Sequence, residues 1–289
     1  MRVYLDVPHE SIALARIRQA VAYYAPDSVE IVEDERSAEV VVLTVIGRFQ
    51  QTTRRVRSMC ARGQRYAVIQ VCLESTMVPD PRDWLQLWRG ALVVWSTYNL
   101  EAMIGRIPGF YHAPFGADAD AFRLPVNGGD SRLYLMMASG PSWLTESVRE
   151  VVLACRSVGG RPVVLGPGGA GRDVDTMTGL SDAQLADLYR QCWYVSGLRR
   201  TEGFELGAAE GILCGARPVL FDRPHYREWY DGLGVFIRER SRPEVIADVR
   251  AMLACGLRPV TETTRADAAQ RFDWARLAGG FWERCLDAA

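Results

Sequence analysis

The sequence predicts an α/β protein built from two doubly wound, Rossmann-like domains. Short apolar segments alternate with amphipathic ones along the chain, which is typical of parallel sheets covered by helices. At 289 residues the chain has room for two domains of ordinary size. A cluster of Pro, Asn and paired Gly at residues 125–130 is expected to separate them.

The first domain is expected to span residues 1–125. Its strands are predicted at residues 3–7, 29–32, 40–45, 66–71 and 91–95, with helices at 12–24 and 54–62. The segment 40–45 is almost entirely apolar, as a buried parallel strand requires. Ligands meet such sheets at the carboxyl ends of the strands. The loops expected on the reactive side are therefore those at His9, 44–48, 72–77 and 96–99.

The second domain is expected to span residues 126–272. Its strands are predicted at residues 133–138, 162–165, 193–195 and 218–221, with a helix at 146–156. A helix over 181–189 has Ser181 as its N-cap and Gln184 in the capping-box position. The glycine run at 166–171 lacks a phosphate-loop lysine, which favours a flexible loop. A last segment, 273–289, is expected to form a helix that returns to the first domain.

Composition excludes some classes of function. The net charge of −1 gives no overall attraction to nucleic acid or to an anionic membrane. All 34 basic residues are arginine, so any phosphate contact must come from arginine or backbone N–H groups. The seven cysteines include no CxxC pair, which argues against a zinc site and favours a reducing, cytoplasmic location. No apolar run reaches about 18 residues, so no transmembrane anchor is expected.

Residues 202–220 are the most informative stretch. They predict a polar turn, a short helix, a glycine stop at Gly215 and a buried strand. The helix is expected to begin near Phe204 or Glu205, and the N–H groups of its first turn would carry partial positive charge. The apolar residues at helical spacing, expected in the core, are Leu206, Ala209 and Leu213.

This arrangement suits a sugar attached to a diphosphate. A helix N-terminus can hold the diphosphate. Glu202 before the helix and Glu210 within it can each accept hydrogen bonds from a pair of hydroxyls, one pair on a ribose and one on a sugar. The two carboxylates have seven residues between them.

The segment 199–219 resembles the donor site of the retaining nucleotide-sugar glycosyltransferases of the GT-B fold, in particular the family 4 group. That group carries Glu-x7-Glu within Ser-x-x-Glu-Gly-Phe-Gly-x-x-x-x-Glu-Ala-x-Ala-x-Gly-x-Pro-Val. Here Arg199 stands at the Ser position, and one extra residue precedes Pro218. Glu205 stands where the family has Gly or a small residue near the diphosphate. A carboxylate there repels phosphate unless an arginine offsets it.

The resemblance implies two domains with a cleft between them and transfer of a sugar, with retention, from a nucleoside-diphosphate sugar to a hydroxyl. No obligate metal or other cofactor is implied, and a UDP or GDP sugar is the favoured donor. Glu202 would orient the donor sugar and Glu210 would hold the ribose. The candidate catalytic residues are Glu202 and, on the acceptor side, Glu74 and His9.

The resemblance also supplies donor-binding candidates. They are Ser139, Gly179, Leu180, Arg199, Arg200, Gly203, Phe204, Glu205, Leu206 and Glu210. Backbone groups at Gly179 and Leu180 would contact the base. Family members often carry Arg and Lys in the turn that here reads 139–142. Arg199 and Arg200 either replace that charge or are surface arginines. Residues 110–122 resemble the family's interdomain linker.

The acceptor is left open between a protein, a small metabolite and a hydroxymethylated base in DNA, the last as in phage-type enzymes of this fold. Arginines in the first domain that keep DNA open are Arg48, Arg54, Arg55, Arg57, Arg62 and Arg65, and a solvated helix face explains them as well. Two other classes stay open. Glu205 and the missing basic pair are consistent with a non-catalytic GT-B-like binding protein, and a nucleotide-sugar epimerase shares the architecture.

Overall fold

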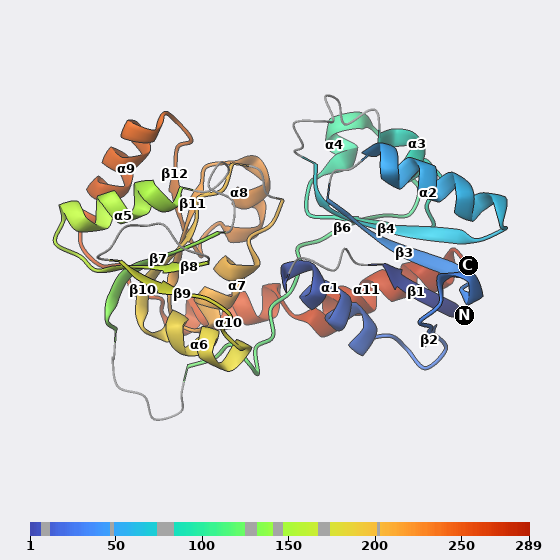
Figure 1. Cartoon of the computed structure of the whole chain (residues 1–289), viewed down its shortest axis with the longest axis horizontal. Helices are drawn as coiled ribbons and strands as arrows, with labels where there is room; N and C mark the ends of the chain where they lie inside the picture. The colour runs from blue at the N-terminus through green and yellow to red at the C-terminus, as the bar shows by residue number, and fades with distance from the viewer. Residues whose placement is uncertain are drawn as a thin grey trace. The chain divides into compact units, whose positions relative to one another are not determined.

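The computed structural model describes residues 1–6, 12–46, 49–73, 84–124, 132–140, 147–166, 174–200 and 203–289. The chain forms two compact units (Figure 1). The first unit comprises Met1–Gly116, Thr201–Phe204 and Asp273–Ala289, and the second comprises Ala117–Arg200 and Glu205–Phe272. The chain therefore passes between the units at four places.

The described residues of the first unit form a six-stranded parallel sheet in the order β2-β1-β3-β4-β5-β6. The strands are β1 (Arg2–Asp6), β2 (Glu30–Ile31), β3 (Val40–Ile46), β4 (Arg65–Cys72), β5 (Val94–Ser96) and β6 (Phe110–His112). The order reverses between β1 and β3. Open parallel sheets bind ligands at such a switch point.

Helices cover both faces of this sheet. They are α1 (Ile12–Tyr23), α2 (Phe49–Ala61), α3 (Leu85–Arg89), α4 (Leu100–Ile104) and α11 (Trp274–Asp287), with the short 3-10 helix η1 (Glu35–Ser37). In Figure 1, α2 and α3 lie over one face, and α1 and α11 lie over the other. Two buried hydrogen bonds hold α11 in place: Trp282 Nε1 donates to Val21 O over 2.8 Å, and Tyr111 Oη donates to Leu277 O over 3.0 Å.

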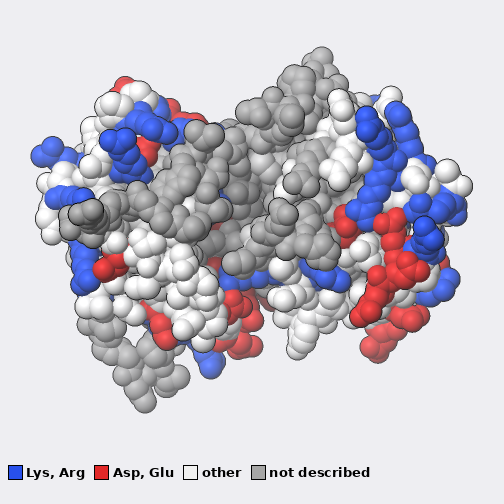
Figure 2. Space-filling model, in the orientation of Figure 1, with Lys and Arg blue, Asp and Glu red and all other residues white. Residues whose placement is uncertain are grey.

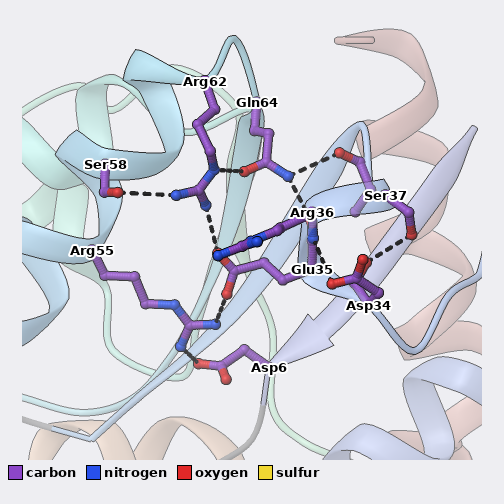
Figure 3. A network of polar contacts seen from close by, with 10 residues as sticks. Asp6, Asp34, Glu35, Arg36, Ser37, Arg55, Ser58, Arg62 and Gln64 are labelled. Atoms are coloured by element: carbon purple, nitrogen blue, oxygen red, sulfur yellow. Dashed lines mark hydrogen bonds and ion pairs between the residues drawn. The ribbon is translucent and has the colours of Figure 1, made fainter.

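A network of charged side chains joins β1, η1 and α2 (Figure 3). The Arg55 guanidinium binds Asp6 at 2.5 Å and Glu35 at 2.6 Å, and Arg62 binds Glu35 at 2.7 Å. Burial lowers the pKa of Arg55, but the hydrogen bonds and charges of Asp6 and Glu35 outweigh it, and the pKa is raised. The side chains keep partial exposure, so each pair contributes at most about 1 kcal/mol.

The described residues of the second unit also form a six-stranded parallel sheet, in the order β12-β11-β10-β7-β8-β9. The strands are β7 (Tyr134–Ser139), β8 (Pro162–Leu165), β9 (Asp175–Met177), β10 (Cys192–Gly197), β11 (Arg217–Phe221) and β12 (Val235–Ile237). Counted from β7, this is the Rossmann order, and it reverses between β7 and β10. Both sheets confirm the predicted pair of doubly wound domains.

Six helices accompany the second sheet in the described residues: α5 (Val148–Ser157), α6 (Asp182–Arg190), α7 (Leu206–Leu213), α8 (Pro224–Tyr230), α9 (Arg242–Ala254) and α10 (Glu262–Arg271). In Figure 1, α5 and α9 lie together on one side of the sheet, and α6, α7 and α10 lie on the other. Ser181 caps α6 with the predicted capping box. Gly215 follows α7 with φ +87°, as predicted for a helix stop.

The segment expected to be the linker is partly regular structure. Residues 110–112 form β6, which pairs in register with β5. Ala117–Leu124 pack with the second unit, because Ala117 N donates to Phe272 O over 2.9 Å and the Phe122 ring lies against Tyr189. The boundary near 125–130 lies in a stretch that the structure describes only up to Leu124.

No helix in the described ranges has both the length and the apolar character needed to cross a bilayer. Basic and acidic side chains are interspersed on the face shown in Figure 2. On the first unit, arginines stand beside a group of acidic side chains there, so the described side chains of this face form no unbroken basic field for a nucleic acid.

Candidate functional site

The candidate site lies at the switch point of the second sheet. β7 ends at Ser139 and its neighbour β10 ends at Gly197, and the two strands run parallel side by side. The loop after β10 carries Arg199 and Arg200, and α7 starts at Leu206 with Glu205 as its N-cap. The fold thus brings five of the predicted donor residues to one edge of the sheet: Ser139, Arg199, Arg200, Glu205 and Leu206.

Arg199 connects the ends of the two central strands. Its Nε lies 3.1 Å from Oε1 of Glu205, and its Nη2 donates to Ser139 Oγ over 3.3 Å. Glu205 is 3% exposed, so this ion pair is largely shielded from water. The prediction that an arginine offsets the Glu205 charge agrees with this contact, and the same contact uses part of the positive charge that Arg199 would offer a phosphate.

Arg200 belongs to a second ionic cluster. Its Nη1 donates to Ser147 Oγ, in front of α5, over 3.0 Å, and lies 3.9 Å from the buried Glu150 carboxylate. Its Nε lies 3.8 Å from Glu239, which also pairs with Arg223 at 2.7 Å. Arg199 therefore reaches Ser139, the first residue of the turn 139–142 where the resemblance expects a basic pair, and Arg200 reaches Ser147 beyond that turn. Residues 141–146 lie outside the described ranges.

Glu210 faces the interior of the second unit. It is 3% exposed, and Oε2 accepts a hydrogen bond from Tyr189 Oη over 3.2 Å. Tyr230 lies near the same carboxylate, and its Oη donates to Glu205 O over 2.6 Å. Burial, followed by the charges of Glu205 and Glu210, raises the pKa of Tyr230 well above its usual value. Tyr230 is therefore held as a neutral hydrogen-bond donor.

The first turn of α7 is tightly packed. Leu206 is buried, whereas Gly207 is partly exposed. The helix lies close to β10, as Gly211 shows: a Cβ added there would lie 2.6 Å from Val195 Cγ1. The buried positions of Leu206, Ala209 and Leu213 confirm the predicted apolar face.

Gly203 and Phe204 are seated in the first unit. Thr97 Oγ1 donates to Gly203 O over 3.0 Å, and a Cβ on Gly203 would lie 2.1 Å from Val71 O. The buried Phe204 ring meets Phe115 edge-on at 5.8 Å. The structure thus shows these two residues in packing contacts of the first unit, while Glu205 and the helix after it belong to the second.

The remaining donor candidates lie before α6. Gly179 is exposed with φ +64° and has open space around its α-carbon, and Leu180 is partly buried beside it. Their proposed contact with a base stays a prediction.

Several sequence candidates lie outside the described residues. These are the three catalytic candidates Glu202, Glu74 and His9, together with Arg48 and most of the glycine run, 167–171. Their flanks are described: Asp6 ends β1 before His9, and Cys72 ends β4 before Glu74. Asp6 is a carboxylate at the first switch point, and its contact with Arg55 gives it a structural partner.

The sequence did not single out the residues that surround the two helix glutamates. Tyr189 and Tyr230 are the main examples, because each puts a phenol against the α7 segment. Tyr189 is only the last residue of the helix predicted over 181–189, and Tyr230 carries no local signal. Among the described residues, no three His, Cys, Asp or Glu side chains are grouped closely enough to hold a metal ion.

No model of a known protein family matches the sequence, and no curated protein matches it. Solved structures do resemble the fold. HepE of Anabaena, crystallised with UDP and glucose, is 14% identical with a TM-score of 0.71, and the match covers 98% of both chains. AviGT4, a glycosyltransferase involved in avilamycin A biosynthesis, is 15% identical with a TM-score of 0.66, over 99% of this chain and 97% of that one.

A third similar structure is sucrose-phosphate synthase from Thermosynechococcus elongatus, 12% identical with a TM-score of 0.70, which matches over 98% of this chain and 81% of that one. At such identities the likeness establishes architecture. Together with the two parallel sheets, it shows that this chain has the two-domain GT-B fold.

Proposed function

We propose that this chain is a glycosyltransferase that moves a sugar from a nucleoside-diphosphate sugar to a hydroxyl acceptor, with retention. The observation that carries the proposal is the gathering of the α7 N-terminus, Arg199 and Arg200 at the Rossmann switch point, with Glu210 one turn into the helix. Helix N-termini bind phosphate through free N–H groups. Arginine adds charge-assisted hydrogen bonds.

In this proposal the protein stabilises the negative charge that develops on the leaving diphosphate. The first turn of α7, Arg199 and Arg200 supply that stabilisation. Glu210 accepts hydrogen bonds from the ribose hydroxyls, and Tyr189 orients its carboxylate. Glu202 orients the donor sugar, and Glu74 and His9 stay candidates on the acceptor side. UDP-glucose is the first donor to test, because HepE was crystallised with it.

Titration with UDP and UDP-glucose tests the donor site. Glu210→Gln keeps the side-chain size and an oxygen for Tyr189, but it replaces a carboxylate oxygen by an NH2 group that cannot accept from ribose. We expect UDP affinity to fall about 10- to 100-fold, as for the loss of one or two hydrogen bonds to a charged group. Glu262→Gln is the matched control, because that side chain of the same unit is 89% exposed.

If Glu210→Gln binds UDP as tightly as the native chain does, the donor site has been placed wrongly. Transfer is tested separately by incubating the protein with UDP-glucose and candidate hydroxyl compounds, and by analysing the anomeric configuration of any product. A chain that binds the donor but neither transfers nor hydrolyses it would instead be a binding protein. The Arg199–Glu205 contact is consistent with that second candidate.

A further inference from the structure

The Glu205 carboxylate pairs with the Arg199 guanidinium, which a donor phosphate at this site would also contact. Glu205 is the N-cap residue of α7, where the partial positive charge of the helix favours an anion. Its side chain does not cap the helix by a hydrogen bond but turns to Arg199, at 3.1 Å. A helix N-terminus and an arginine, the two features that bind phosphate, thus already have an anion beside them.

The surroundings of Glu205 hold it in that place. The Tyr230 hydroxyl binds the Glu205 carbonyl at 2.6 Å and fixes the backbone. The side chain lies over Gly197 at the end of β10, where an added Cβ would be 3.0 Å from Glu205 Cγ. The same added Cβ would lie 2.5 Å from Leu220 Cδ2, so there is little free space beside the Glu205 side chain. The pair is therefore packed into the switch point.

The Arg199 guanidinium lies between Glu205 and the end of β7. Its Nε contacts Glu205, and its Nη2 contacts Ser139 at the carboxyl end of β7. A diphosphate bound at the switch point would meet this guanidinium. Two anions would then share one cation, and because the Glu205 carboxylate is buried, their mutual repulsion would be only partly screened.

We infer that Glu205 competes with the donor phosphates for Arg199 and so sets the affinity of the site for nucleoside diphosphates. This inference rests on the proposed function, and it makes Glu205 a specificity-determining residue. Its carboxylate opposes binding in proportion to the negative charge of the ligand, and it leaves contacts to the base and ribose unaffected.

The test compares a charged and an uncharged ligand. UDP and uridine are titrated against the native chain and against Glu205→Gln, which keeps the size of the side chain and an oxygen for Arg199. We expect Glu205→Gln to bind UDP about tenfold more tightly, because one opposing charge is gone. The affinity for uridine should change less than about twofold. Glu262→Gln controls for the change in net charge.

Glu205→Gly, the residue type that the resemblance expects here, is the second variant, and thermal unfolding shows whether each variant is folded. Unchanged or weaker UDP binding by both folded variants overturns the inference. An equal change for UDP and uridine also overturns it, because Glu205 would then act only through the shape of the site. If neither the native chain nor the two variants bind UDP or GDP, the proposed function itself is refuted. If UDP binding weakens in Glu210→Gln but is unchanged in Glu205→Gln and Glu205→Gly, only the role of Glu205 is refuted.

Discussion

Gly203 occupies a position that has no room for a side chain. Its φ lies outside the left-handed region, so alanine can adopt the same backbone conformation and the effect of Gly203→Ala is purely steric. The added Cβ would lie 2.1 Å from Val71 O and 2.7 Å from Tyr98 Cε2. Ordinary contact begins at 3.4 Å, so the segment must move by about 1.3 Å (3.4 − 2.1).

The cost of this movement follows from what it disturbs. Val71 O is backbone of a central strand and cannot rotate away, and overpacking of this kind costs about 1–3 kcal/mol. The same shift stretches the hydrogen bond from Thr97 Oγ1 to Gly203 O, worth about 1 kcal/mol. We therefore expect Gly203→Ala to lower the free energy of unfolding of the first unit by about 2–4 kcal/mol.

Urea unfolding followed by tryptophan fluorescence measures this loss. The signal reports mainly on the first unit, whose buried tryptophans are Trp84, Trp88, Trp95, Trp274 and Trp282. Gly279→Ala in α11 is the control, because that glycine has ordinary φ and no atom within 4 Å of an added Cβ. In a helix it should be neutral or stabilising by up to about 1 kcal/mol. The steric reasoning is refuted if the two variants unfold within about 0.5 kcal/mol of each other.

Two further outcomes are expected in the first unit. Burial, with a smaller effect of Cys60, raises the pKa of Tyr66 to about 12. The unfolded chain therefore loses this proton near pH 10 while the folded chain keeps it, and stability falls between about pH 10 and 12. Tyr66→Phe should lack this part of the decline in alkaline urea titrations, and identical pH profiles would contradict it. Trp282→Phe removes the bond to Val21 O and should cost about 1–3 kcal/mol at neutral pH, leaving UDP affinity unchanged; a loss below 0.5 kcal/mol would show that packing alone holds α11.

Local rules explain why much of the fold could be predicted. Apolar runs such as residues 40–45 need burial on both faces, and this requirement already specifies a parallel sheet with helices on each side. The capping box at Ser181 and the glycine stop at Gly215 act within a few residues, so the sequence determines them directly. The short strands β6, β9 and β12 were not predicted, whereas the equally short β5 was, because an apolar run at residues 91–95 leads into it.

The same distinction holds within the candidate site. The sequence identified the α7 segment and its two arginines, because the donor-site resemblance lies in one continuous stretch. It also foresaw that Glu205 needs an arginine. It did not indicate Tyr230, whose phenol comes from a helix 25 residues further along the chain.

By itself, then, the sequence determined which segments are buried, where helices start and stop, and which stretch carries the donor-site pattern. The first two follow from interactions between near neighbours in the chain, and the third from the resemblance of one continuous stretch. Only the tertiary structure decided that Gly203 and Phe204 are seated in the first unit while Glu205 belongs to the second, and that Ser139 meets Arg199. Those pairings depend on strand order, which brings distant residues together through packing that no short stretch of sequence encodes.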